Sequence, residues 1–425
     1  MNQSLALAIM AFGKSVLLTG PAGAGKTYVL NQFIAEARAK GKQVSVTATT
    51  GLAATHLGGT TIHSWSGIGI ADYIQQGFFE RFPKGKRDII ARTDVLIIDE
   101  ISMLHDYRLD MVDEVCRTIR DNQDEPFGGI QVILSGDFFQ LPPINHQNSR
   151  QGGFVVNSQV WQQFDPVICY LKEQHRQDDE ELLGVLNALR AGTLRQSHLD
   201  TLLARSEVHP DEFEVVTELH TVNVDVDTLN AAKLKEIDED EVSYERLETG
   251  PKAFVETLDR SVLAPKELKL KLGALVMAVR NSQERKYVNG SLGVVVAFDP
   301  DTNYPIVKFK NGKEVLMTPD TWELHDGGKK RASITQIPLR LAWAITVHKS
   351  QGMTLDTARI NLAKAFVEGM GYVALSRIKN VNSLYLTGIN QMALRVSEQA
   401  RSIDGYLREK AESDAEQFAH LLPRV

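Results

Sequence analysis

Short, continuous runs of apolar and β-branched residues recur along the first part of the chain. Turn residues and then a helical pattern follow each of them. The runs lie at residues 15–19 (SVLLT), 43–48 (QVSVTA), 95–99 (VLIID), 132–135 (VILS) and 167–171 (VICYL). Continuous apolar runs are typical of parallel strands that are covered on both faces. Helical stretches intervene, as at 28–39 and 108–120. The alternation predicts a doubly wound parallel sheet, which binds ligands beyond the carboxyl ends of its strands.

A second series of apolar runs predicts another α/β unit later in the chain, with strands at 215–221, 341–346, 358–362 and 384–387. Between parts of this series the pattern of apolar and polar residues changes. Residues 266–335 hold short alternating segments at 274–279, 293–298, 305–310 and 314–318. Tight-turn signals such as Asn289-Gly290 and Asn311-Gly312 separate them. We interpret this region as a small antiparallel β-barrel inserted into the second unit.

The fold class that follows is α/β, with two parallel-sheet domains and one small inserted barrel. We expect the domains at 1–165, at 166–255 with 336–425, and at 256–335. Residues 233–248 carry 7 acids against 3 bases, and such a charge run is expected to be a solvated helix or linker. The tail at 395–425 has a helical pattern.

Composition narrows the classes of function. The 425 residues allow two to four domains, and 43% apolar with 24% charged residues is typical of globular proteins. The net charge of -7 excludes a uniformly basic, histone-like surface. Residues 266–335 nevertheless hold 12 Lys and Arg against 8 Asp and Glu, so a local basic groove for nucleic acid remains compatible. Cys116 and Cys169 are expected to be reduced core thiols.

Targeting and membrane segments are not expected. No apolar run approaches the roughly 20 residues that span a bilayer. A phosphate-loop pattern begins at Gly20, which leaves no room for a cleavable leader. We therefore expect a cytoplasmic protein without a membrane partner.

The segment GPAGAGKT, residues 20–27, matches the phosphate-loop pattern G-x-x-x-x-G-K-[ST]. Its glycines (Gly20, Gly23 and Gly25) allow backbone N–H groups to turn inward around a β-phosphate. Lys26 would place its charge at the β- and γ-phosphates, and the Thr27 hydroxyl would ligate Mg²⁺. A glycine-rich turn without a ligand is the alternative, but this segment also follows a predicted strand and opens a predicted helix. It predicts a bound nucleoside triphosphate, with Mg²⁺ as the metal cofactor.

Polar residues follow two further predicted strands. Asp99 and Glu100 end the run VLIID; Asp99 would hold Mg²⁺, and Glu100 would orient and deprotonate the attacking water. Alone, such a pair is commonly a solvated strand end. Gln140, in GDFFQLPP after the next strand, could hydrogen-bond the γ-phosphate. Alone, this segment is merely a loop with two prolines.

Together these motifs resemble those of a superfamily-1B DNA helicase of the PIF family. The resemblance to this family is closer than the resemblance to the related RecD and Dda enzymes. The residues that carry the resemblance are, in chain order, TATTGLAATHLGGTTIHSWSGI (47–68), ISMLHDYRLDMVDEVCRTIR (101–120), GDFFQLPPI (136–144), LKEQHRQDD (171–179), WAITVHKSQGMTLD (343–356) and GYVALSRIKN (371–380). They correspond to the family's DNA-gripping, signature, third, fourth, fifth and sixth motifs. The resemblance spans residues 1 to about 390 and implies two RecA-like domains with an SH3-like inserted barrel.

The resemblance also implies roles for individual residues. Arg176 and Arg377 look like the two arginines that reach the γ-phosphate, although the residues alone favour a surface ion pair for each of them. Gln140 would sense the γ-phosphate, and Gln3 resembles the glutamine that recognises adenine. The implied DNA contacts are Thr50, Gly51, Thr61 and His63 in the first unit and Thr346, His348, Lys349 and Ser350 in the second.

Aromatic residues leave alternatives open. Trp65 could stack on a base, but a core or interface position is the favoured interpretation; Trp161, Trp322 and Trp343 are expected to be packing residues. The family places a strand-separating element at 69–92, where Phe78, Phe79 and Phe82 could form an apolar wedge. The alternative is a helix that packs its own face.

The resemblance implies an ATP-driven motor that moves 5′-to-3′ on single-stranded DNA as a monomer. It implies unwinding of forked duplex, RNA–DNA hybrids and G-quadruplex DNA, in DNA repair, recombination and telomere maintenance. In a bacterium, the enzyme would be associated with the nucleoid. An RNA-directed motor of the same superfamily is one alternative. The other is a non-catalytic DNA-binding scaffold, against which the complete set of catalytic residue types argues.

Overall fold

The computed structural model describes residues 1–69, 71–145, 147, 149–173, 179–209, 216–221, 223–259, 262–280, 282, 284, 286–287, 289–326, 329–355 and 357–422. The chain divides into two compact units. The first comprises Met1–Arg176, Asp326–Gly328 and Val396–Val425, and the second comprises Gln177–His325 and Lys329–Arg395.

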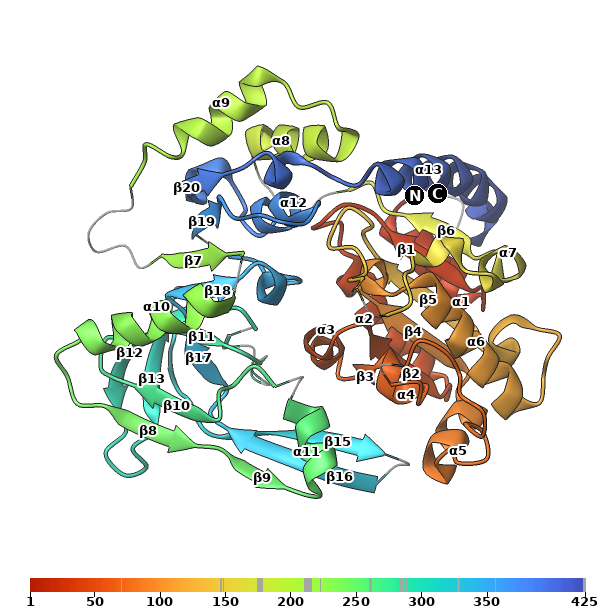
Figure 1. Ribbon diagram of the computed structural model, residues 1–425, viewed down its shortest axis with the longest axis horizontal. Coiled ribbons are helices and arrows are strands. Elements are labelled where there is room, and N and C mark those ends of the chain that lie inside the picture. Colours follow the sequence, from red (N-terminus) through yellow and green to blue (C-terminus); the bar gives the residue numbers. More distant parts are fainter. Residues whose placement is uncertain are drawn as a thin grey trace. The chain divides into compact units, whose positions relative to one another are not determined.

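The first unit is built on a parallel sheet of six strands (Figure 1). The spatial order is β3-β2-β4-β5-β1-β6. The strands are β1 (Val16–Thr19), β2 (Val44–Ala48), β3 (Thr60–Thr61), β4 (Val95–Asp99), β5 (Gln131–Gly136) and β6 (Val167–Tyr170). Strand β1 and all of β4 except its last residue are buried. Burial on both faces explains why these strands are continuous apolar runs rather than alternating ones.

Helices cover both faces of this sheet. They are α1 (Gln3–Ala11), α2 (Lys26–Ala39), α3 (Gly51–His56), α4 (Ile62–Trp65), α5 (Lys84–Arg92), α6 (Asp106–Arg120), α7 (Val160–Phe164) and α13 (Glu398–Phe418). Side chains of α1 and α2 form one core with β1, β4 and β5, and Phe418 of α13 belongs to the same core. The helical pattern of the tail is thus confirmed as α13.

Two of the expected domain boundaries differ from the structure. Strand β6, expected in the second unit, pairs with β1 residue by residue, from Val16 with Val167 to Thr19 with Tyr170. The tail, also expected there, packs on β6: the Asp414 carboxylate accepts a hydrogen bond from the Ile168 N–H at 2.7 Å. An edge strand needs a helix over its face, and here the distant end of the chain supplies it. Such long-range pairing leaves no local signal in the sequence.

The second unit contains a parallel sheet of four strands in the order β18-β7-β19-β20. Its strands are β7 (Thr217–His220), β18 (Ala344–Thr346), β19 (Ala358–Leu362) and β20 (Leu384–Ile389). The helices of this unit are α8 (Glu180–Ala191), α9 (Gln196–Ala204), α10 (Asn223–Glu236), α11 (Lys252–Asp259) and α12 (Met370–Leu375). The predicted second α/β series is confirmed.

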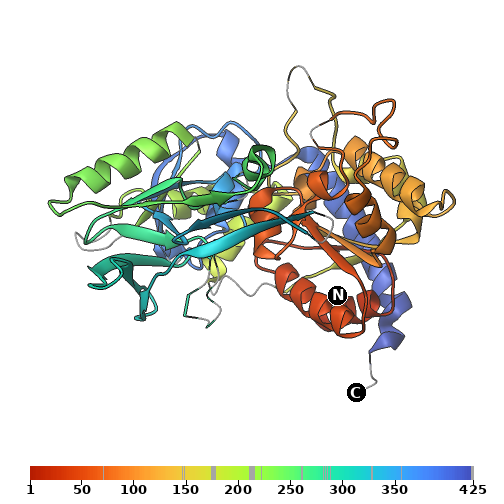
Figure 2. The ribbon, with the colours of Figure 1, turned by 90° about the horizontal axis from the view of Figure 1, so that it is seen from below.

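Antiparallel sheets are inserted into the second unit (Figure 2). The largest has the order β14-β13-β12-β11-β17, with β11 (Leu275–Ala278), β12 (Leu292–Phe298), β13 (Pro305–Phe309), β14 (Glu314–Leu316) and β17 (Leu339–Leu341). A two-stranded sheet pairs β8 (Val242–Glu245) with β10 (Glu267–Leu270), and a three-stranded one has the order β15-β16-β9, with β9 (Leu247–Thr249), β15 (Asp320–Asp326) and β16 (Lys329–Gln336). The four strands expected in this region exist within one or two residues of their predicted ends.

The acidic run at 233–248 is not one solvated helix or linker. It contains the end of α10 and then β8, whose side chains alternate between half-buried and exposed. Tyr244 of β8 packs against the core of the inserted sheets. The high charge of the run made its sequence look like a solvated segment, although part of it is an edge strand whose polar residues face solvent. Among the described residues, no helix is long and apolar enough to cross a membrane.

Candidate functional site

The phosphate loop connects β1 to α2, as its sequence predicts. Gly20, Gly23 and Gly25 all have positive φ angles, of 142°, 85° and 83°. At Gly20 a Cβ atom would lie 2.5 Å from the Leu171 carbonyl oxygen, so only glycine fits there. The Lys26 Nζ donates to the carbonyl oxygens of Gly20 at 2.8 Å and Pro21 at 3.0 Å, so its side chain curls back over the loop.

The neighbouring elements place further predicted residues beside this loop. Thr27 is exposed in the first turn of α2. At the start of α1, Asn2 caps the helix, and the Gln3 Nε2 donates to the Ala24 carbonyl oxygen at 3.2 Å. Gln3 therefore contacts the phosphate loop directly, which is compatible with its predicted role at the nucleotide.

Asp99 lies at the carboxyl end of β4, two strands away from β1 in the sheet order. Burial raises the pKa of its carboxyl group, while the Ser135 hydroxyl, the Glu100 N–H and the charge of Lys26 act in the opposite direction. The electrostatic effect of Lys26 on Asp99 brings the predicted phosphate cation and the predicted metal ligand into one site.

A raised Asp99 pKa gives a testable pH dependence. Mg²⁺ requires the ionised carboxylate, and a raised pKa means that Asp99 binds its proton at a higher pH than an ordinary carboxyl, which titrates near about 3.9. We expect the Mg²⁺ affinity of the protein–ADP complex, measured by titration calorimetry, to fall as the pH is lowered towards that raised pKa. Asp99→Asn should weaken Mg²⁺ binding at least about tenfold at pH 8.

The free energy of unfolding should change with pH in the opposite direction to the Mg²⁺ affinity. Because folding raises the Asp99 pKa, the ionised form is less favourable in the folded protein, and its stability falls as the pH rises through that pKa. Without nucleotide, Asp99→Asn should therefore be more stable than the wild type at pH 8. A variant with unchanged Mg²⁺ affinity and unchanged stability would contradict the placement of Asp99.

Glu100 is held in a strained backbone conformation directly after β4. Its φ is 54° and its ψ is 45°, in the left-handed region that non-glycine residues seldom adopt. The Thr49 Oγ1 donates to the Glu100 carbonyl oxygen at 2.9 Å, and the Thr49 N–H donates to the Asp99 carbonyl oxygen at 3.2 Å. Thr49 stands in the predicted DNA-gripping motif, so one residue joins that motif to the predicted acid pair Asp99 and Glu100. Sequence reasoning missed this role.

Gln140 follows β5 in a tight turn and is buried, with 6% of its surface exposed. The turn is organised by Asp137: its carbonyl oxygen accepts from the Gln140 N–H at 3.0 Å, and its Oδ1 accepts from the Phe139 N–H at 3.2 Å. The segment is therefore more than a loop with two prolines, because a buried carboxylate fixes the backbone that presents Gln140.

The predicted DNA contacts of the first unit lie on the short helices that follow β2 and β3. Thr50 and Thr61 accept hydrogen bonds from the N–H groups of Ala53 and Ser64, both at 3.2 Å. Each capping hydroxyl keeps its own proton as a donor for a phosphate oxygen. Gly51 opens α3. Burial and then the charges of Arg108 and His105 lower the pKa of His63 to about 4. His63 is therefore neutral at physiological pH.

The three candidate wedge phenylalanines lie before α5 rather than on it, so the alternative of a helix packing its own face is wrong for them. Phe82 is buried, and its ring lies 2.7 Å from where a Gly67 Cβ would be. This burial contradicts a direct wedge role for Phe82. Phe78 and Phe79 are half-buried, with the Phe78 ring centroid 5.1 Å from that of Phe79 and 5.3 Å from that of Phe82.

The tryptophans support the packing interpretation. Trp65 is 7% exposed and its Nε1 has no hydrogen-bond partner, which confirms a core position rather than an open stacking surface. Trp161 and Trp322 are buried as well, and Trp343 packs against the core of the inserted sheets.

In the second unit, Arg377 is almost completely buried after α12. Its Nε donates to the Val373 carbonyl oxygen at 2.9 Å, and its Nη1 donates to those of Ser350 at 3.4 Å and Met353 at 3.3 Å. The guanidinium therefore binds the backbone of the loop that contains the predicted DNA contacts. Arg176 lies outside the described residues.

The predicted DNA contacts of this unit lie at the carboxyl end of β18 and in the short 3₁₀ turn His348–Ser350. Thr346 is 2% exposed, and burial lowers the pKa of His348, which keeps its imidazole neutral. Ser350 is fully buried and donates to the Val347 carbonyl oxygen at 2.7 Å. Its position favours shaping the loop over direct contact. The side chain of Lys349 is not among those that the structure describes.

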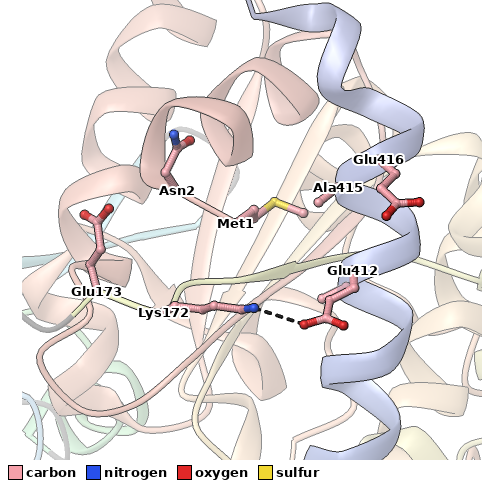
Figure 3. Close-up of a pocket in the computed structure, with 8 residues that line it drawn as sticks. Met1, Asn2, Lys172, Glu173, Glu412, Ala415 and Glu416 are labelled. Carbon is pink, nitrogen blue, oxygen red and sulfur yellow. Dashed lines mark hydrogen bonds and ion pairs between the residues drawn. The ribbon is translucent and has the colours of Figure 1, made fainter.

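A pocket of about 470 Å³ lies between α13, the N-terminal end of α1 and the segment after β6 (Figure 3). Lys172 and Glu412 form an ion pair across it at 3.0 Å, and the Met1 amine donates to the Tyr170 carbonyl oxygen at 2.7 Å. Its lining contains neither phosphate-loop residues nor Asp99 and Glu100. This pocket is therefore separate from the nucleotide site.

Comparisons with known proteins agree with this geometry. A family model described as PIF1-like helicase matches residues 2–189, and one described as the 2B domain of the DNA helicase Pif1 matches residues 253–298. The ATP-dependent DNA helicase Pif1 of Psychrobacter sp. is 40% identical over 96% of this chain and 71% of its own length.

Three solved Pif1 structures are similar as well, each covering 97% of both chains, and the two with a bound nucleotide analogue are from Bacteroides. The complex with ADP-AlF4 has a TM-score of 0.83 at 31% identity. The complex with ADP-AlF3 and single-stranded DNA has a TM-score of 0.69 at 32% identity. A structure described as showing DNA unwinding at forked duplex DNA by two coordinating Pif1 helicases has a TM-score of 0.67 at 32% identity.

A phosphate loop with an acid pair on one parallel sheet, and a second parallel sheet with antiparallel inserts, define a nucleotide-driven motor with two RecA-like domains. The chain belongs to the Pif1 family of ATP-dependent DNA helicases.

Proposed function

We propose that this chain hydrolyses ATP to move 5′-to-3′ along single-stranded DNA, and that it unwinds forked duplexes, RNA–DNA hybrids and G-quadruplex DNA. The observation that carries the proposal is the pair of hydrogen bonds from Thr49 to the backbone of Asp99 and Glu100. A shift of the acid pair during hydrolysis is transmitted through Thr49 to Thr50 and Gly51, which follow it in the chain. The single-stranded DNA in the Bacteroides complex supports the substrate.

The nucleotide roles follow from the site. Lys26 binds the β- and γ-phosphates, the phosphate-loop amides surround the β-phosphate, and Gln3 contacts adenine. The Thr27 hydroxyl and the Asp99 carboxylate offer the hard oxygen ligands that Mg²⁺ prefers, so the donor set fits this ion. Bound there, Mg²⁺ neutralises phosphate charge. Glu100 accepts the proton of the attacking water, and Gln140 senses the γ-phosphate.

Arginines complete the proposed chemistry. Arg377 and Arg176 stabilise the negative charge that develops on the γ-phosphate in the transition state, as the family resemblance implies. Arg377 also binds the carbonyl oxygens of Ser350 and Met353 in the loop with the second set of DNA contacts. Movement of its guanidinium towards nucleotide would therefore release that loop and change its grip on DNA.

The DNA contacts are mostly uncharged. Thr50, Thr61 and neutral His63 can donate to phosphate oxygens, and we assign the same task to His348 and Lys349. Thr346, which is only 2% exposed, shapes the loop together with the buried Ser350. Phe78 and Phe79 remain candidates for strand separation. The antiparallel inserts, with an SH3-like barrel among them, supply a basic backbone track.

The proposed partners are single-stranded and forked DNA. We propose that one copy translocates as a monomer, while the two coordinating Pif1 helicases of the forked-duplex structure suggest that two copies can act at one fork. A motor of this kind works where the chromosome is, so we assign it to the cytoplasm and nucleoid.

The test is ATP hydrolysis with and without single-stranded DNA. We expect strong stimulation of the wild type, and we expect Lys26→Ala to lower the stimulated kcat by about 10²–10³-fold because it removes a charge that stabilises the transition state. Lys14→Ala, which changes an exposed lysine before β1, is the matched control. Matched RNA strands test the RNA-directed alternative. If single-stranded DNA does not change the rate of ATP hydrolysis by the wild type, the proposal is contradicted.

A further inference from the structure

An exposed phenylalanine lies beside the predicted DNA-contact loop of the second unit. Phe366 has 56% of its surface exposed, an unusual state for so large an apolar side chain. It stands between β19 and α12, whereas His348 follows β18. Both strands belong to one parallel sheet, so their carboxyl ends share an edge. Phe366 and the DNA loop therefore meet at the same edge.

The rings of Phe366 and His348 are nearly parallel. Their centroids are 6.4 Å apart and their planes are inclined by 22°, within the range of offset-stacked aromatic pairs. The loop's 3₁₀ turn fixes His348 at one end of the pair. The two rings together present an aromatic surface beside groups that are assigned to phosphate contacts.

The turn that carries Phe366 is held firmly despite its exposure. The Asn390 Nδ2 donates to the carbonyl oxygens of Ala363 at 3.0 Å and Ala365 at 2.8 Å. The Ala365 N–H donates to the Leu362 carbonyl oxygen at 3.2 Å, and the Gly369 N–H to that of Arg395 at 2.9 Å. A fixed aromatic ring loses little conformational entropy when it binds a flat partner.

We propose that Phe366, with His348, forms a stacking platform for one nucleobase of the bound single strand. The inference rests on the proposed function and adds a base contact to a site otherwise built for phosphates. Aromatic stacking tolerates every base, which suits a motor that must move along any sequence. The exposed Lys364 and the half-buried Glu368 each stand two residues from Phe366 in the sequence.

The test combines deletion of the ring with deletion of a base. Binding of single-stranded DNA is measured by fluorescence anisotropy with a series of strands that each carry one abasic residue, at successive positions. We expect Phe366→Ala to bind the intact strand about tenfold more weakly, within the range that stacking supplies. Wild type should lose a similar factor when the stacked base is absent, and Phe366→Ala should lose nothing further at that position.

Two variants and one further readout separate stacking from general damage. Phe366→Trp should keep the wild-type profile, and Phe12→Ala, at an equally exposed phenylalanine (60%) in the first unit, should behave as wild type. The salt dependence of binding should be the same for Phe366→Ala, because no phosphate contact is removed. Equal affinity and an equal abasic profile for Phe366→Ala and wild type would overturn the platform alone. Absence of single-stranded DNA binding by the wild type would overturn the proposed function with it.

Discussion

Arg377→Ala should lower ATP hydrolysis stimulated by single-stranded DNA by about 10³–10⁵-fold, the range seen when an arginine that stabilises phosphoryl transfer is removed. The reason is electrostatic, because a guanidinium fork matches the oxygens of a phosphoryl group that gains charge in the transition state. ATP binding should weaken much less than kcat. Single-turnover hydrolysis and equilibrium nucleotide binding together measure the two effects.

Arg377 is buried, so loss of structure must be distinguished from loss of catalysis. Arg377→Lys keeps the charge but not the fork, and it should still lose most of the rate. Arg190 is a matched control, since it is also buried in the second unit and donates to the Tyr372 hydroxyl at 3.0 Å. Arg190→Lys should hydrolyse ATP nearly as the wild type does. If the Arg377→Ala protein is folded and hydrolyses ATP at the wild-type rate, Arg377 has no catalytic role.

Glu100→Gln should lower kcat by about 10²–10⁴-fold, the usual contribution of a general base. The amide has nearly the same shape as the carboxylate, and the left-handed backbone at this position does not depend on the side-chain charge. Binding of ATP and of single-stranded DNA should therefore persist. Presteady-state measurement of phosphate release checks the rate, and an unchanged burst would contradict the assignment.

The strain at Glu100 makes a second variant informative. A left-handed conformation costs a non-glycine residue about 1–2 kcal/mol, and glycine avoids this cost. Glu100→Gly should therefore be inactive yet more stable than the wild type, by about 1 kcal/mol in the free energy of unfolding. Loss of both activity and stability would show that the backbone is not strained as described.

The sequence alone predicted the elements whose pattern is local. The run VLIID is β4 and 358–362 is β19, residue for residue, because continuous apolar strands in a parallel sheet have a strong local signature. The phosphate loop was equally readable, since each of its glycines has a positive φ and Lys26 reaches back over the loop. These parts of the site needed no tertiary information.

Other features depend on contacts that no local pattern reveals. The pairing of β6 with β1 and the packing of α13 join distant parts of the chain, and Ile168 and Asp414, for example, are 246 positions apart. In the sequence, Phe82 is as good a wedge candidate as Phe78 and Phe79, but in the structure its ring packs against Gly67. Ser350 matches a DNA-contact motif, yet its side chain is fully buried and its hydroxyl donates to the Val347 carbonyl oxygen. A motif match does not reveal which of its side chains are buried.

The most direct test of the central claim is ATP-dependent displacement of streptavidin from biotinylated single-stranded DNA. A motor that moves 5′-to-3′ should accelerate the release of streptavidin from a 3′-biotin and leave a 5′-biotin unaffected, and Lys26→Ala should accelerate neither. If the wild type hydrolyses ATP on the same strands but accelerates release at neither end, or only at the 5′ end, the account of a 5′-to-3′ motor is wrong.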